Sequence, residues 1–216
     1  MINRGKAAQA AGKANEEMVE QMLTIFRAES NAYWRKTNPM VKNLGPVGKG
    51  AMFKAVYAAK GMPDYLLVAP VGYYSGPQVV MFDAKGIRAK GTTTIKGEDQ
   101  RQQMLDIQAT GAAAGGFLVR WYYESTVTAL NEWRWHPCQR TTLEAATVTK
   151  VKRGNKRQVD IRVVRINRGD GILVESLPTF TPDTPGQPIL ESFLAAVVAG
   201  TIMPEVADLY DVRVAG

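Results

Sequence analysis

The chain has 216 residues, of which 45% are hydrophobic and 22% charged, a composition typical of a globular protein rather than a disordered one. Its formal net charge of +7 favours a polyanionic partner such as nucleic acid. A single histidine, His136, and a single cysteine, Cys138, exclude an intrachain disulfide, a structural zinc site and any mechanism that needs two histidines.

The sequence also excludes two kinds of partner. No G-x-x-x-x-G-K-[ST] string occurs, so we expect no nucleotide cofactor. No apolar run approaches the roughly 18 residues that a membrane-spanning helix needs, so we expect no membrane partner. With one cysteine in the chain, the reducing cytoplasm is the expected compartment.

Residues 7–28 predict an amphipathic helix. At about 100° per residue its apolar arc contains Met18, Val19, Met22, Leu23, Ile25 and Phe26. Glu16 lies at the edge of this arc, Glu17 points well away from it, and Glu20 lies between the two. Glu16 is therefore the acid best placed to reach a site at the buried face, whereas Glu17 and Glu20 are interpreted as helix-start carboxylates that favour the helix dipole.

The next segment is basic. We expect a short strand at 31–37, a flexible connection over 38–50, and a helix over 51–60 with Gly61 as its C-cap. Two aromatic residues are interleaved with four lysines, Lys42, Lys49, Lys54 and Lys60. A solvated basic loop and a projection into nucleic acid both remain open at this point.

Residues 63–85 predict a β-hairpin, because two apolar runs of strand length flank Gly and Pro residues. Side chains alternate along a strand, so Val79, Met81, Asp83 and Lys85 share one face of the second strand. Asp64 opens the partner strand and can lie close to Asp83 and Lys85. Two carboxylates can hold Mg²⁺, and a lysine can orient the attacking water, although solvation of a strand end is the alternative interpretation.

A second basic loop is expected at 86–97, where Arg88, Lys90 and Lys96 could contact phosphates. A helix then starts at Glu98-Asp99-Gln100 and runs to about Thr110. The Gly-rich 111–116 stretch is interpreted as a helix–strand turn, and strands are expected at 117–123 and 132–136. His136 is interpreted as a packed or surface residue.

This order of elements predicts an α/β fold with a mixed central sheet flanked by helices. Residues 1–145 would form the core, 41–61 a basic stalk-like insertion and 146–216 a basic C-terminal extension. Within the extension we expect strands and then a helix, at 147–151, 158–166, 171–176 and 189–200.

Several local patterns, in the same order along the chain, resemble the PD-(D/E)XK nucleases and, within them, the Holliday junction resolvases of the bacterial RecU type. The similarity covers about residues 3–123. The matching strings are Asn3-Arg4-Gly5, Gly12 with Glu16-Glu17, Asp64-Tyr65, Phe82-Asp83-Ala84-Lys85, Asp99-Gln100 with Met104, and Gly115-Gly116-Phe117-Leu118-Val119. Asp83 stands where the family has glutamate, and the family's histidine before Gln100 is missing.

The resemblance implies a PD-(D/E)XK-like core and a Mg²⁺-dependent endonuclease that cuts four-way DNA junctions as a homodimer, with Mn²⁺ able to substitute. It implies that Asp64 and Asp83 hold the metal with help from Glu16, that Lys85 orients the water, and that Gln100 supports it. Segment 41–61 corresponds to a stalk that enters the junction. Two alternatives remain open, namely another nuclease of the superfamily that acts on duplex or flap DNA, and a non-catalytic DNA-binding protein.

Overall fold

The structure is a computed structural model, and it describes residues 4–37, 41–46, 53–57, 62–70, 79–111, 113–124, 129–152, 155–175, 177 and 185–201. Within these ranges there are three α-helices, α1 (Arg4–Ser30), α2 (Glu98–Ala109) and α3 (Gly186–Thr201). The helices predicted from the sequence near the two ends of the chain and after residue 97 are confirmed.

A mixed sheet forms the centre of the described structure. Six strands follow the order β1-β4-β5-β7-β8-β11, with bounds Tyr33–Lys36, Tyr65–Val68, Val79–Ile87, Ala113–Glu124, Ala129–Pro137 and Ile172–Leu173. Strands β5 and β7 pair in parallel, and the other neighbours in this sheet pair antiparallel. The predicted α/β class with a mixed central sheet and the predicted β4–β5 hairpin are therefore confirmed.

The two faces of the sheet bury two separate hydrophobic clusters. On one face, Val80, Phe82 and Ala84 of β5 pack with residues of α1 and α3. On the other face, Met81 and Ile87 pack with residues of α2 and β10. The alternation expected for β5 is thus confirmed, and Asp83 shares its face with the α2 side.

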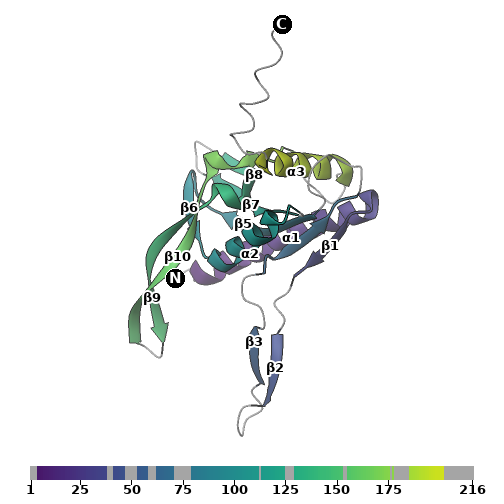
Figure 1. The fold of residues 1–216 in the computed structure, drawn as a ribbon. Helices are drawn as coiled ribbons and strands as arrows, with labels where there is room; N and C mark the ends of the chain where they lie inside the picture. Colours follow the sequence, from purple (N-terminus) through teal and green to yellow (C-terminus); the bar gives the residue numbers. More distant parts are fainter. Residues whose placement is uncertain are drawn as a thin grey trace.

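Two hairpins extend from this body. The pair β2 (Val41–Pro46) and β3 (Phe53–Tyr57) forms a sheet of its own. The other hairpin consists of β9 (Thr142–Lys152) and β10 (Asn155–Asn167), and β6 (Thr92–Ile95) pairs with the base of β10. Both hairpins project on the side of the body opposite α3 (Figure 1).

Two sequence predictions about this region are wrong. The segment 51–60 does not form the predicted helix, because Phe53–Tyr57 pairs as a strand with Val41–Pro46 inside the predicted flexible connection. Its aromatic and β-branched residues favour a strand once a partner strand is present. The predicted C-cap Gly61 lies outside the described residues. The predicted loop 86–97 contains strand β6, which is a run of β-branched residues.

The C-terminal third returns to the body after the β9–β10 hairpin. The boundary predicted between residues 145 and 146 falls inside β9. The predicted strand at 171–176 is reduced to Ile172–Leu173, which pairs with β8, and α3 packs in the same cluster as α1. Among the described helices, none is both long and apolar enough to cross a membrane.

Two adjacent glycines in β7 allow close packing on either side of this strand. A Cβ added at Gly115 would lie 2.6 Å from Met104 Cβ of α2, and one added at Gly116 would lie 2.6 Å from the His136 carbonyl oxygen of the neighbouring strand β8. Both distances are far below van der Waals contact. Gly115 therefore lets α2 lie close on the sheet, and Gly116 lets β8 lie close to β7.

We expect Gly116→Ala to lower the free energy of unfolding by about 1–3 kcal/mol, because the backbone of β8 must move to admit the methyl group. Gly12→Ala is the matched control. A Cβ at Gly12 meets nothing within 4 Å, so alanine should stabilise helix α1 by about 0.5–1 kcal/mol. Denaturant unfolding measures whether each substitution lowers or raises the free energy of unfolding. Equal stability of the two variants would contradict this packing account.

Candidate active site

Asp83 lies at the centre of the site and its side chain is fully buried on β5. Its Oδ1 accepts hydrogen bonds from the backbone N–H of Asp64 at 2.7 Å and from Gln100 Nε2 at 3.1 Å. Its Oδ2 lies 2.8 Å from Lys85 Nζ, and the same ammonium lies 3.5 Å from Asp64 Oδ2. The structure therefore brings Asp64, Asp83, Lys85 and Gln100 together, as the sequence predicted.

Burial controls the protonation of this group. Loss of solvation raises the pKa of Asp83 to about 6, against the opposing effect of the Lys85 ammonium. Burial also favours the neutral amine of Lys85, but the carboxylates of Asp83 and Asp64 outweigh it and raise the lysine pKa. Lys85 is therefore a cation held between two carboxylates.

The donor set fits Mg²⁺. Asp83 Oδ2 is a buried oxygen that, within the described part of the chain, accepts no hydrogen bond of regular geometry, although Lys85 Nζ is close. Asp64 is partly exposed and gives access from solvent. Mg²⁺ prefers oxygen ligands and usually takes one or two carboxylates while keeping several waters. Asp64 and Asp83 would hold it, and the described residues contain no cluster of three His, Cys, Asp or Glu side chains suited to a metal.

Glu16 lies in a neighbouring cluster on the α1 side of the site. Lys36 Nζ is 3.1 Å from Glu16 Oε2 and 2.6 Å from Glu20 Oε1, and the Tyr65 hydroxyl donates to Glu20 Oε1 at 3.4 Å. The hydrogen bond that Lys36 donates to Glu20 is the main cause that raises the pKa of Lys36. The structure thus pairs Glu16 with a lysine and does not bring it into contact with Asp64 or Asp83.

This cluster adds residues that the sequence analysis missed. Glu20, interpreted above as a helix-start carboxylate, follows Glu16 by one turn and shares its lysine partner. Lys36 pairs in register with Tyr65, the residue after Asp64, and this proximity depends on strand pairing that the sequence does not reveal. Glu17 forms an exposed ion pair with Lys13 at 3.2 Å, as its outward phase predicts.

The segment that carries Asp64 is fixed from two sides. The backbone N–H of Thr37 donates to the Asp64 carbonyl at 2.9 Å, and the Thr37 hydroxyl donates to the Pro63 carbonyl. Gln100 Nε2 also lies 3.4 Å from the Met62 carbonyl. The β2–β3 hairpin lies between Thr37 and Met62 in the sequence. The residues that flank this insertion therefore contact the segment that carries Asp64.

The predicted DNA-contacting residues are only partly described. Arg88, Lys90 and Lys96 are exposed, and Lys90 Nζ lies 4.4 Å from the centre of the Tyr123 ring. Lys42 and Lys54 fall on the backbone of β2 and β3, whereas Lys49 and Lys60 lie outside the described residues. The described members of this set therefore lie on two separate parts of the chain, the exposed residues of 88–96 and the strands of the β2–β3 hairpin.

His136 belongs to the core. It is buried on β8, its Nε2 accepts a hydrogen bond from Trp121 Nε1 at 3.2 Å, and burial lowers its pKa to about 4. A neutral histidine packed against a tryptophan agrees with its interpretation as a packed residue. It contributes to the sheet rather than to the carboxylate site.

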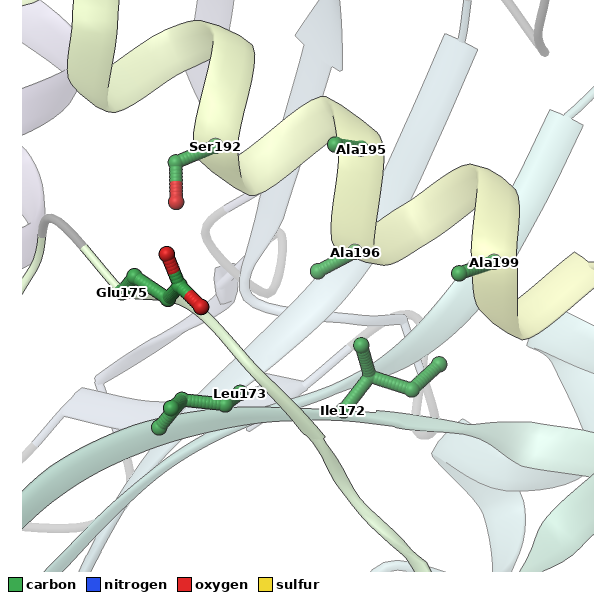
Figure 2. A pocket seen from close by; sticks show the side chains of 7 residues that line it. All are labelled: Ile172, Leu173, Glu175, Ser192, Ala195, Ala196 and Ala199. Carbon is green, nitrogen blue, oxygen red and sulfur yellow. The ribbon is translucent and has the colours of Figure 1, made fainter.

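A separate pocket of about 380 Å³ lies between β11 and α3. It is lined by Ile172, Leu173, Glu175, Ser192, Ala195, Ala196 and Ala199, and Figure 2 shows Glu175 and Ser192 pointing toward one another at one end. The remaining lining is aliphatic. This pocket shares no residue with the carboxylate site and lacks a comparable set of charged groups.

No protein-family model matches this chain, and no curated protein matches it. One solved structure that it resembles is Hjc, a Holliday junction resolvase from the archaeal hyperthermophile Archaeoglobus fulgidus. The sequences are 12% identical, the TM-score is 0.37, and the match covers 79% of this chain and 97% of the resolvase chain. The resemblance is a loose one of fold.

The raised pKa of Asp83 predicts opposite effects of pH on the metal-free and metal-bound protein. The folded pKa of about 6 exceeds the ordinary 3.8, so the folded state binds the proton more tightly. The contribution of Asp83 to metal-free stability is therefore present at low pH and is lost as pH rises from about 4 to about 6. A divalent cation competes with that proton, so its stabilising effect should disappear as pH falls through about 6.

Unfolding of wild type and Asp83→Asn between about pH 4.5 and 7.5, with and without Mg²⁺, measures both effects as differences between the two proteins. His136 titrates in both proteins and cancels in the difference. A difference that does not change with pH, or a Mg²⁺ effect that Asp83→Asn retains, would contradict the assignment of the buried carboxylate.

Thr37 should act as a positioning residue for Asp64. Thr37→Val removes the hydroxyl bond to Pro63 while keeping the backbone bond to Asp64, and Thr37→Ser keeps both. We expect valine to weaken Mn²⁺ or Mg²⁺ binding about tenfold, the scale on which outer groups orient metal ligands, and serine to retain it. Cation titration followed by thermal unfolding measures this. Equal affinities for the two variants would show that the hydroxyl has only a packing role.

Proposed function

We propose that this chain is a Mg²⁺-dependent endonuclease that cuts four-way DNA junctions. The observation that carries the proposal is the fully buried Asp83 carboxylate, joined to Asp64 and Lys85 at one end of a sheet. Burying a carboxylate beside a second one is costly unless a cation compensates it. This arrangement suits a protein that binds a divalent cation, and the basic hairpins suit a substrate with many phosphates.

Each residue has a distinct role in the proposed reaction. Asp64 and Asp83 hold Mg²⁺, with Mn²⁺ as a substitute. Mg²⁺ bound there supplies a water of lowered pKa and offsets negative charge on the scissile phosphate. Lys85, whose ammonium is already fixed by both carboxylates, orients the attacking water and stabilises charge that develops at phosphorus.

Gln100 and Glu16 act around this centre. Gln100 holds the Asp83 carboxylate and the Met62 carbonyl together, so it fixes the distance between β5 and the segment that carries Asp64. Glu16 assists from the adjacent cluster, where Lys36 holds it close to the start of β4. Its exposure leaves it free to exchange Lys36 for a hydrated cation.

The proposed preference for junctions rests on the β2–β3 hairpin. This hairpin projects from the body (Figure 1), and its base is bonded to the Asp64 segment through Thr37. Residues 38–61 contain four lysines and no acidic residue. A positive projection beside the cleavage site can enter the open centre of a junction, which a linear duplex lacks. Two symmetric cuts need two such sites, so the proposed enzyme acts as a homodimer.

We expect the purified protein to cut a labelled four-way junction in Mg²⁺ and to cut a linear duplex of the same sequence much more slowly. Asp64→Asn, Asp83→Asn and Lys85→Ala should each reduce junction cleavage by at least about 10²–10³-fold, the scale of losing one preorganised charge at a transition state. All three should still bind the junction. Glu17→Gln, which changes an exposed ion pair, is the control for Glu16→Gln and should leave the rate unchanged.

The same assay separates the alternatives. Equal cleavage of junction and duplex would indicate a nuclease without junction preference. Binding without metal-dependent cutting would indicate a non-catalytic DNA-binding protein. Cleavage near the wild-type rate by Asp83→Asn would overturn the assignment of the site.

A further inference from the structure

The positive charge of the chain is concentrated in the two hairpins. Residues 142–168, which form β9 and β10, contain eight basic and two acidic residues, a net charge of +6 in a chain whose total is +7. Residues 38–61 add +4, so the rest of the protein carries a net charge of −3. A charge distribution this uneven attracts a polyanion to the hairpins rather than to the body.

Along the β9–β10 hairpin, arginines near the base pair with acids, whereas the sequence of the tip is basic without any acid. Near the base, Arg165 lies 2.7 Å from Glu144 and Arg162 lies 3.4 Å from Glu98, and Arg168 pairs with Glu132. Near the tip, residues 150–157 contain five basic residues and no acidic one. The net charge of this hairpin is therefore strongest at the end farthest from the body.

The hairpin is built as a rigid polar arm. The two strands pair without a break in register from Arg165 opposite Thr142 to Asn155 opposite Lys152. Cross-strand side-chain bonds reinforce the middle, with Thr147 Oγ1 donating to Asp160 Oδ1 at 2.8 Å and Thr149 Oγ1 donating to Gln158 Oε1 at 3.2 Å. The described strands of the arm are therefore held in one continuous register from their base to Lys152 and Asn155.

The arm is joined to the body next to the candidate active site. Arg162 of β10 contacts Glu98, the first residue of α2, and Gln100 in the same turn donates to Asp83. The β2–β3 hairpin is anchored to the other side of the site through Thr37. Both hairpins project in the same general direction (Figure 1). The candidate active site therefore lies near the bases of two positively charged hairpins.

We propose that the β9–β10 hairpin is a second DNA-binding arm, which holds the phosphate backbone of a duplex segment adjoining the cleavage point. That this duplex is part of a cleaved substrate rests on the proposed function, whereas the binding of duplex DNA by the hairpin does not. Lysine and arginine contacts to phosphate position a duplex without reading its sequence. A membrane surface fits less well, because residues 150–157 contain one apolar side chain, Val151, and insertion into lipid needs an apolar face.

The test compares two triple variants of equal charge. The arm variant changes Lys152, Arg153 and Lys156 to alanine, and the control variant changes the exposed residues Lys13, Arg27 and Arg140 to alanine. Binding of a fluorescent duplex and a four-way junction is measured without divalent cation over a series of salt concentrations. Each lost phosphate contact should reduce the salt slope by about 0.9, so we expect a slope smaller by about 2–3 and an affinity at least about tenfold lower for the arm variant.

The control variant should keep its slope within about one unit of wild type, because net charge alone makes no fixed phosphate contacts. Equal losses by the two variants would overturn the proposal, as would a loss of binding to anionic lipid vesicles without any loss on DNA. Thermal unfolding checks that both variants are folded before their affinities are compared.

A cleavage assay tests the DNA-binding role of the arm separately from the proposed nuclease reaction. The arm variant should need about tenfold more junction than wild type to reach half-maximal cleavage, because its changes weaken binding, whereas the control variant should cut like wild type. If wild type binds DNA through the arm but never cuts it, the nuclease proposal is wrong and the DNA-binding role of the arm is supported. If wild type cuts and the arm variant binds DNA like the control variant, the DNA-binding role of the arm is wrong and the nuclease proposal is supported.

Discussion

Compensation of the buried Asp83 carboxylate is the constraint on which the rest of the site depends. An unpaired carboxylate in the interior costs several kcal/mol, so every group around it must be held in place. The compensating groups are Lys85 on the same strand, the Asp64 backbone before β4, and Gln100 in the first turn of α2. Three elements must therefore meet within hydrogen-bonding distance, and Gly115 of β7 permits this by letting α2 lie directly on the sheet.

Electrostatics also explains why the arms and the site are separate parts. Outside residues 38–61 and 142–168 the sequence has a net charge of −3, and in the proposed function the carboxylates of Asp64 and Asp83 would face the scissile phosphate. In the proposed function this centre would repel DNA without a cation, whereas the hairpins would attract it. Affinity would then come from residues remote from the chemistry, and cleavage would depend on the cation that offsets the carboxylates. The hydrogen bond of Thr37 with Pro63 and the ion pair of Arg162 with Glu98 lie where they would set the position of the proposed DNA relative to Asp83.

The sequence predicted the parts of the site that depend on local pattern. Strand alternation placed Asp83 and Lys85 on one face, and a short hairpin brought Asp64 beside them. Gln100 came from the family resemblance, since nothing in its own helix points to Asp83. Lys36, Thr37 and Glu20 were missed because their contacts require β1 to pair with β4 and α1 to cross the sheet. The helix expected at 51–60 failed for the same reason, since its strand exists only through pairing with β2.

Lys36 and Lys85 show how similar charges come to serve different purposes. Each ammonium lies between two carboxylates, but the two carboxylates beside Lys36 are partly exposed and solvated by water. The pair around Lys85 includes a carboxylate with no exposure, so the lysine cannot compensate both acids as fully as water would. The residual negative charge is confined to a small volume beside solvent-accessible Asp64. Binding of a hydrated divalent cation would relieve this excess, and the same loss of solvation raises the pKa of Asp83, so that it takes up a proton as the pH falls through about 6.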